Sequence, residues 1–328
     1  MIFRALRLLA TCLVAVSLFG AAHAQEELRF IMVTHGAASD DFWRMVKEGT
    51  DRAATEMDVG VEYRAPEEFD LKKMTDLLTA AVEEKPDGLI VSIPNADAVA
   101  APIRAAVEAG IPVITINSGF DVGRSLGALL HVGQSEYEAG RVAGETMRKL
   151  GGNKALCVNH ELGNVGLDLR CKGFIDGFAG SVEVMPVEAD AAEAGKAIAD
   201  RLTEDTEIDV VLTLSANVAG EPAIAAAKSL GEGRKVRVAT FDLTDAVLNA
   251  VADGAAAFAI DQQPFLQGYL PVEFLTLLKR HRVVPVSNVS TGPRLITLNE
   301  ARQRLGRSDA EGTTGEANPP EAPAAGGG

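Results

Sequence analysis

The chain has 328 residues, 47% of them hydrophobic and 5% aromatic, and its 46 acidic residues outnumber 31 basic ones to give a formal net charge of −15. A surface with this excess of acid repels nucleic acid and offers no basic patch for it, so nucleic-acid binding is excluded. The length exceeds that of one typical domain, and we expect two.

Residues 1–24 have the pattern of a cleaved secretory signal peptide. Two arginines precede an apolar run over 8–19, and the small residues of "AHA" at 22–24 form a cleavage site before Gln25. A lipoprotein signal ending at Cys12 is the competing interpretation, but a threonine is a poor residue directly before such a cysteine. We expect a free soluble exported protein that begins near Gln25, because no later apolar run is long enough to span a membrane.

The segment after this signal alternates between strand-like and helix-like patterns. Strands are expected at 28–34, 61–65, 88–93 and 111–117, and helices at 41–58, 70–84 and 96–109. Apolar strands separated by helices indicate a parallel sheet covered on both faces. We predict a doubly wound, Rossmann-like α/β domain for this half of the chain.

The alternation then begins again and predicts a second domain of the same class. Strands are expected at 154–159, 182–187, 209–214, 236–241 and 256–260, and helices at 135–150, 167–179, 191–204, 218–230 and 244–252. After a last helix over 264–279, the short apolar segments 283–288 and 294–298 are expected to return to the two domains. The segment 306–328 has no apolar period and predicts a disordered tail.

Two cysteines remain after the signal, Cys157 and Cys171. They lie on a predicted strand and on the helix that follows it, and an even pair in an oxidising compartment favours a disulfide. Two buried thiols are the alternative interpretation. Neither interpretation provides a catalytic nucleophile.

The stretch "SDDFW" places the chain's single tryptophan, Trp43, beside Phe42 at the start of the first helix. Phe42 falls on an apolar stripe with Val46, Gly49 and Ala53, which predicts that Phe42 faces the core. Consecutive helical residues point about 100° apart, so Trp43 is expected to face a cleft. We predict that its ring covers the apolar face of a ligand.

Polar side chains gather where the predicted strands end, which is where ligands bind in open α/β sheets. Taken singly, each one is more often a helix cap or a turn residue than a ligand contact. Together with two aromatic rings, these amides, carboxylates and hydroxyls suit a neutral polyhydroxylated ligand. The candidates among them are Asp40, Asp41, Ser92, Asn117, Asn164, Asp168, Asn217, Asp242 and Gln262.

Patterns typical of enzymes or metal sites are missing from the sequence. The segment after the first strand reads "HGAASDDF" and lacks the G-x-G-x-x-G of dinucleotide enzymes, and no G-x-S-x-G is present. The histidines have no metal-ligand spacing. We therefore expect no catalytic residues, no metal and no cofactor, with a secreted α/β enzyme as the minor alternative.

Seven motifs in order over 28–298 carry a family resemblance: "DDFW", "PDGLIVSIPNADAV", "GIPVITIN", "HVGQSEYEAGRVAGE", "RCKGFIDGF", "FDLTD" and "DQQPFLQGY". With these motifs the chain resembles the periplasmic sugar-binding proteins of ABC importers, the type I group that includes ribose- and galactofuranose-binding proteins and the ligand domains of LacI-type repressors. The resemblance implies a monomer that captures a sugar or polyol and delivers it to a permease in the inner membrane. A receptor that presents its ligand to a sensor kinase or chemoreceptor is the alternative.

The resemblance also implies roles for individual residues. The aromatic clamp falls on Phe42 and Trp43, the polar residue before it on Asp40, and further ligand contacts on Ser92, Asn117, Arg170, Asp242 and Gln262. Two positions depart from the ribose-binding pattern, because Asp168 and Ser118 stand where ribose binders carry arginines. These departures favour a different sugar or a polyol.

The resemblance further implies two lobes that close around the ligand by a hinge of three chain crossings, near 129–134, 259–264 and 284–290. The ligand cleft would lie between the lobes. The lobes would comprise 25–130 plus 263–287 and 131–262 plus 288–305.

Overall fold

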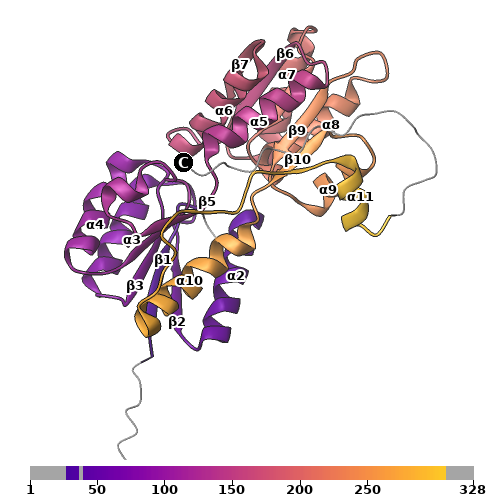
Figure 1. Cartoon of the computed structure of the whole chain (residues 1–328). Helices are drawn as coiled ribbons and strands as arrows, with labels where there is room; N and C mark the ends of the chain where they lie inside the picture. The colour runs from indigo at the N-terminus through magenta and orange to yellow at the C-terminus, as the bar shows by residue number, and fades with distance from the viewer. Residues whose placement is uncertain (1–26, 37–39, 308–328) are drawn as a thin grey trace, which may run out of the picture.

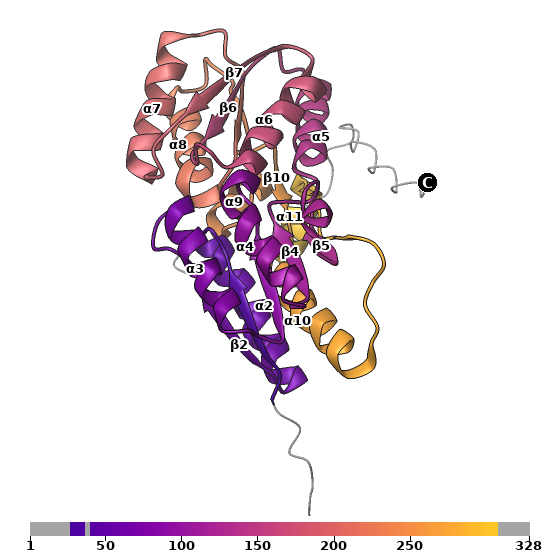
Figure 2. The same ribbon diagram turned by 90° about the vertical axis from the view of Figure 1, so that its left-hand side faces the viewer.

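The computed structural model describes residues 27–36 and 40–307. They form two lobes, each built on one six-stranded sheet with helices on both faces (Figures 1 and 2). The predicted signal over 1–24 lies outside the described residues. Within the described part of the chain, no helix has both the length and the apolar character needed to cross a membrane.

The first lobe has the strand order β11-β5-β4-β3-β1-β2, and every pairing in it is parallel. Its strands are β1 (Arg29–Val33), β2 (Gly60–Arg64), β3 (Gly88–Ser92), β4 (Val113–Asn117), β5 (Leu130–Gly133) and β11 (Val289–Ser290), and its helices are α2 (Asp41–Met57), α3 (Leu71–Glu83), α4 (Ala96–Glu108), the short η2 (Gly123–Leu126) and α10 (Pro264–His281). Alternate residues of β1 enter two separate cores. Phe30 and Met32 pack with α2 and α10, whereas Ile31 and Val33 pack with α3 and α4.

The second lobe has the strand order β12-β10-β9-β8-β6-β7, in which β12 alone is antiparallel to its neighbour. Its strands are β6 (Lys154–Asn159), β7 (Ser181–Pro186), β8 (Val210–Thr213), β9 (Arg237–Phe241), β10 (Phe258–Asp261) and β12 (Arg294–Ile296). Its helices are α5 (Glu136–Lys149), α6 (Val165–Phe178), α7 (Ala191–Glu204), the π-helical η3 (Ala216–Gly220), α8 (Glu221–Ser229), α9 (Asp245–Ala252) and α11 (Leu298–Arg304). Helices α5 and α6 cover one face of this sheet, and α7 and α8 cover the other.

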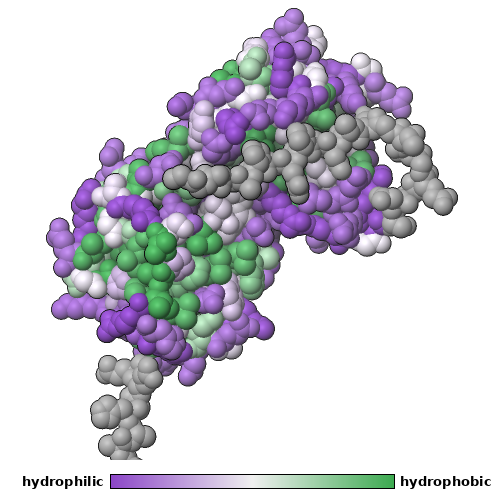
Figure 3. Space-filling model, viewed as in Figure 1, coloured by the Kyte–Doolittle hydropathy of each residue, from purple (hydrophilic) through white to green (hydrophobic). Residues whose placement is uncertain are grey.

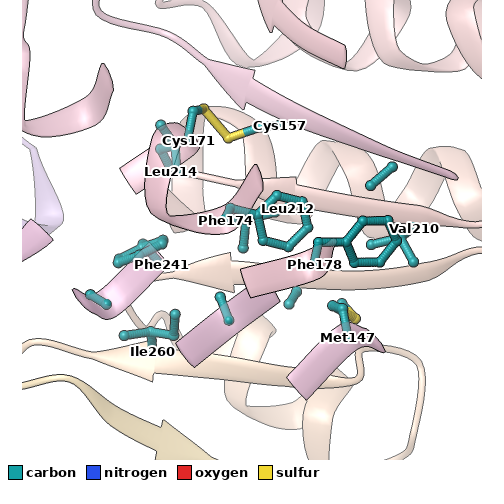
Figure 4. Packing of buried hydrophobic residues seen from close by; sticks show 14 of the residues in the cluster. Met147, Cys157, Cys171, Phe174, Phe178, Val210, Leu212, Leu214, Phe241 and Ile260 are labelled. Atoms are coloured by element: carbon teal, nitrogen blue, oxygen red, sulfur yellow. A yellow bond between two sulfur atoms is a disulfide. The ribbon is translucent and has the colours of Figure 1, made fainter. Parts of the chain in front are cut away.

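The core beneath α5 and α6 contains the predicted disulfide (Figure 4). Cys157 on β6 and Cys171 on α6 are bonded, with their Cα atoms 5.7 Å apart. The prediction of a bridge is confirmed. The bond ties the helix to the strand before it, next to the stacked rings of Phe174 and Phe178.

Glycines allow α5 and α6 to approach backbone to backbone. A Cβ atom on Gly140 of α5 would lie 2.0 Å from the carbonyl oxygen of Arg170, and one on Gly173 of α6 would lie 1.9 Å from that of Tyr137. Contacts this short leave no room for any side chain. The close approach fixes the position of Arg170, which lies on the buried side of α6.

The chain crosses between the lobes three times, but the predicted lobe boundaries need correction. The boundary at 130/131 falls inside β5, and the one at 287/288 precedes β11, yet both strands pair within the first sheet. The first and third crossings therefore follow Gly133 and Ser290, and the second lies between β10 and α10. The short strand β5 was not predicted.

The C-terminal end of the described structure also differs from the prediction. Arg307 belongs to the segment predicted as a tail, but its guanidinium donates to Asp253 Oδ1 at 2.7 Å and to the Asn249 side chain on α9. Residues 308–328 lie outside the described residues. On the face shown in Figure 3, hydrophilic residues cover most of the second lobe, as the acid excess predicts, and hydrophobic residues gather over part of the first.

Candidate ligand-binding site

A cavity of about 620 Å³ lies between the two lobes and is lined by residues from both. Its polar lining comes from strand exits: His35 follows β1, Asn117 ends β4, His160 and Glu161 follow β6, Ser215 follows β8, Asp242 follows β9 and Gln262 follows β10. The carboxyl ends of both sheets therefore meet at one cavity. A second cavity of about 630 Å³ shares Phe42, Asp242 and Gln262 with the first.

Asp40 links the start of α2 to the opposite lobe. Its Oδ1 accepts hydrogen bonds from the backbone N–H groups of Phe42 at 2.9 Å and Trp43 at 3.3 Å, which makes it the N-cap of the helix. Its Oδ2 accepts a hydrogen bond from Asn217 Nδ2 of the second lobe at 3.1 Å. The single carboxylate of Asp40 therefore caps α2 and also bonds to the second lobe.

Both adjacent aromatic residues line the cavity, as predicted for Trp43, but the prediction that Phe42 is the core-facing member of the pair is wrong. Trp43 is only 5% exposed and belongs to the core between β1, α2 and α10, whereas Phe42 is half-buried. A stripe of Trp43, Val46 and Ala53 satisfies the helical period as well as the stripe predicted through Phe42, and the packing of α2 on the sheet and on α10 selects it.

His35 lies beside these rings as a neutral histidine. Its ring meets Trp43 edge to face at a centroid distance of 4.8 Å, and the ring of Phe69 at 5.9 Å. Burial, with the positive charge of Arg170 and the neighbouring His160 adding to it, lowers the pKa of His35 to about 3.

Ser92 and Asn164 contact His35 and do not line the cavity. The Ser92 hydroxyl lies 2.8 Å from His35 Nδ1 and accepts from the His35 backbone N–H at 3.1 Å. Asn164, from the other lobe, lies 3.4 Å from Nε2 and donates to Glu161 at 2.7 Å. The resemblance implies a direct ligand contact for Ser92, but in the structure His35 lines the cavity and Ser92 does not.

Arg170 is buried in the wall of the cavity, where it is held from several sides. Its Nε and Nη2 donate to the two carboxylate oxygens of Glu136 at 2.5 and 3.1 Å, Nη2 also donates to Gln262 Oε1 at 2.9 Å, and Nη1 donates to the Leu214 carbonyl at 3.2 Å. Its guanidinium carbon lies 4.3 Å from the centre of the Phe241 ring.

Asp242 lines the cavity from the end of β9 in a left-handed conformation with φ 69°. Burial raises the pKa of its carboxyl to about 7, although Arg170 and the hydrogen bond donated by Gln262 Nε2 act in the opposite direction. Helix α9 is capped by the Thr244 side chain. The alternative that Asp242 is merely a helix cap is therefore excluded.

The remaining predicted residues divide into two groups. Asn117 lines the cavity, and Asn217 reaches it through Asp40. Asp41 is exposed and paired with Arg44, and it lines only the second cavity. Asp168 is exposed, accepts from Asn159 Nδ2 at 3.0 Å and does not line either cavity.

Sequence analysis missed Phe69 and Glu136. Phe69 lies in the loop before α3, where no strand exit drew attention to it, and Glu136 is buried behind Arg170. His160 and Glu161 could be found at a strand exit, and both line the cavity. Across 27–36 and 40–307, no group of three or more His, Cys, Asp or Glu side chains could hold a metal ion.

Two α/β lobes that are joined by three crossings, and that enclose a polar cavity at the ends of their strands, define a two-lobed ligand-binding protein. Residues 30–281, more than half of the chain, match the family model of the periplasmic binding protein domain. The chain therefore belongs to the periplasmic binding protein family, and it is a binding protein rather than an enzyme.

The chain is similar to several solved structures and to a curated relative. A carbohydrate transporter from Acidothermus cellulolyticus 11B, solved in complex with myo-inositol, is 34% identical with a TM-score of 0.80, over 85% of this chain and 97% of that one. AraP, an arabinose binding protein from Geobacillus stearothermophilus, is 25% identical with a TM-score of 0.65, over 84% and 99%. The xylose/arabinose-binding protein XylF of Sulfolobus acidocaldarius is 24% identical over 317 residues, which are 90% of this chain and 78% of XylF.

Proposed function

We propose that this protein captures a neutral sugar or cyclic polyol between its lobes in the periplasm and delivers it to an ABC permease in the inner membrane. The observation that carries the proposal is the interlobe cavity, which combines hydrogen-bonding side chains with the rings of Phe42, Trp43 and Phe69. Carboxylates and amides can pair with ligand hydroxyls, while a ring plane covers the C–H face.

Within this class, we favour a cyclic polyol such as myo-inositol, or a pentose other than ribose. The relative with 34% identity was solved with myo-inositol, and XylF is named for xylose and arabinose. Ribose is disfavoured because Ser118 donates to Asn117 within the first lobe and Asp168 points away from the cavity, where ribose binders have arginines.

Capture would proceed by closure of the lobes about the three crossings. Contacts between the lobes support this mechanism. Besides Asp40 with Asn217, the backbone N–H of Val165 donates to the Pro94 carbonyl at 2.8 Å, and Asn95 Nδ2 donates to the Gly163 carbonyl at 3.4 Å. These bonds connect rims that would separate in an open form.

A thermal-shift screen of the full chain tests the proposal. The panel contains myo-inositol, xylose, arabinose, ribose and galactose, and positive results are measured again by calorimetry. A ligand at 100 times its dissociation constant adds about 2.7 kcal/mol of stability. If no neutral sugar or polyol in a wide panel shifts the unfolding transition, the proposal is wrong.

Transport also requires export and a permease, whereas a receptor role requires a sensor partner. We propose that residues 1–24 direct export and that the mature protein is a monomer, which fractionation of cells and light scattering will test. Deletion of the permease genes should abolish uptake of the ligand. If deletion of the permease genes leaves uptake unaffected, and deletion of this protein abolishes a transcriptional or chemotactic response, the receptor role would be favoured.

A further inference from the structure

Acidic side chains far outnumber basic ones in the lining of the cavity. Four carboxylates lie exposed at its rim and three lie deeper: Glu67, Glu68, Glu188 and Asp190 at the rim, and Asp40, Glu161 and Asp242 below them. Among the described residues that line it, Arg170 is the single Lys or Arg. The histidines add no positive charge, because burial lowers the pKa of His35 to about 3 and that of His160 to about 4.

Most of the binding capacity of Arg170 is used within the protein. A guanidinium has five N–H donors, and four hydrogen bonds to Glu136, Gln262 and Leu214 are present. Both oxygens of Glu136 face Arg170, so the pair is bidentate and its net charge is zero. One N–H of the arginine is left for a ligand.

Glu136 lies behind Arg170 and not in the lining of the cavity. Its side chain is 2% exposed at the first turn of α5, directly after the first crossing. Gln134 Nε2 donates to Glu136 Oε2 at 3.1 Å and to Gln262 Oε1 at 3.3 Å, so the pair is joined to two of the crossings. Glu136 therefore acts on a ligand from behind the lining, chiefly through Arg170, with which it shares two hydrogen bonds.

We infer that Glu136 is a positioning residue that sets the charge selectivity of the cleft. By neutralising the positive charge of Arg170, Glu136 causes the cleft to reject sugars and polyols that carry a carboxylate or phosphate in favour of neutral ones. The inference rests on the proposed function. An anionic ligand would meet the carboxylates without a free cation, which is discrimination by a repulsive element.

Matched ligand pairs and Glu136→Gln test the inference. D-Glucuronate is D-xylose with an added carboxylate, and myo-inositol 1-phosphate is charged myo-inositol, so calorimetry measures the anionic to neutral ratio of Kd in each pair. In the wild type the neutral member should bind more tightly. Glu136→Gln keeps a hydrogen-bond acceptor for Arg170 and frees its charge, so the ratio should fall by on the order of tenfold to a hundredfold.

Glu145→Gln is the control, because Glu145 lies on the same helix, is partly exposed and pairs with Arg141 away from the cavity. It changes the net charge equally and should leave the ratio unchanged. A merely structural role for Glu136 would weaken both members of a pair alike.

Each remaining outcome is decisive. If Glu136→Gln does not fold, measurements on the wild type decide. The inference is overturned if the wild type binds anionic ligands as tightly as their neutral partners. It is also overturned if the anionic to neutral ratio of Kd does not fall at high salt. An unchanged ratio in folded Glu136→Gln also overturns it. Failure of every neutral sugar and polyol in the wide panel to bind the wild type would instead overturn the proposed function, and the inference with it.

Discussion

Lowering the pH from 8 to 6 should weaken ligand binding through Asp242. With the lobes in contact as in this structure, burial raises the pKa of this carboxyl to about 7, well above the value of about 3.9 for an exposed aspartate. Ligand hydroxyls that donate to the carboxylate favour its ionised form and lower its pKa again. Binding near neutral pH should therefore release a proton.

The size of the effect follows from linkage. If the bound carboxyl returns to a pKa of about 4, Kd should rise by about tenfold between pH 8 and pH 6, which is about 1.4 kcal/mol. His35 and His160 do not contribute, because burial lowers their pKa values to about 3 and 4 and both are neutral throughout this range.

Calorimetry at pH 8, 7 and 6, in two buffers with different heats of ionisation, measures both Kd and the released proton. Asp242→Asn should bind more weakly at pH 8 and lose the pH dependence. Glu161→Gln is the comparison variant, because Glu161 lines the same cavity and burial also raises its pKa; a pH dependence retained in this variant assigns the effect to Asp242. A Kd at pH 6 within about twofold of that at pH 8, or an equal slope in Asp242→Asn, would refute the reasoning.

The same shift predicts the pH dependence of stability without ligand. The folded state binds the Asp242 proton more tightly than the unfolded state does between about pH 4 and 7. This contribution is fully present below the unfolded pKa and is lost as the pH rises through 7. Asp242→Asn should therefore be most stabilising, relative to the wild type, above pH 7.

Four further predictions concern packing and the chain ends. Trp43→Ala should cost about 3–5 kcal/mol of unfolding free energy in denaturant titrations, because the ring is buried in the core. In the wild type, the emission of Trp43 should change on ligand binding, and an unchanged emission at saturation would contradict a position of Trp43 beside the ligand. Gly173→Ala should cost about 1–3 kcal/mol by forcing α5 from α6, whereas Gly233→Ala, with nothing within 4 Å of its added Cβ, should be nearly neutral. Mass spectrometry of unreduced protein should show the Cys157–Cys171 peptide pair two hydrogens lighter than free thiols, and quantitative alkylation of both without reductant contradicts the bridge. Truncation after Arg307 should leave melting temperature and affinity unchanged, whereas removal of Arg307 itself should destabilise α9; a clear loss in the first truncation would show that the tail docks.

Regular alternation made the α/β architecture predictable, since each buried strand is an apolar run between turns. The errors fall on the shortest elements. Strand β5, with four residues, was interpreted as part of a crossing, and the two residues of β11 carry no period of their own. Their membership of the first sheet is decided by tertiary pairing with β4 and β5, which no local pattern encodes.

The candidate site was predictable where a backbone position alone fixes a residue. Asn117, Asp242 and Gln262 are at strand exits, and the ends of parallel strands meet at one edge. Residues on helices were harder, because the phase of a helix decides which side chain faces the cavity. Asp168 and Arg170 are two positions apart on α6, and only Arg170 faces inward.

Helix capping and ligand binding were treated as alternatives for the polar residues at strand exits, but one side chain can cap a helix and also line the cavity, as Asp40 does. In a parallel sheet the next helix starts where a strand ends, so a cap at that point already lies at the ligand edge. A cap needs only one acceptor atom. Asp40 uses Oδ1 for α2 and Oδ2 for Asn217, while Asn164 caps α6 through Oδ1 and directs Nδ2 toward His35. A side chain with a second polar atom can therefore cap the start of a helix and still reach the cleft, as Asp40 does, so a capping motif at a strand exit does not exclude a ligand role.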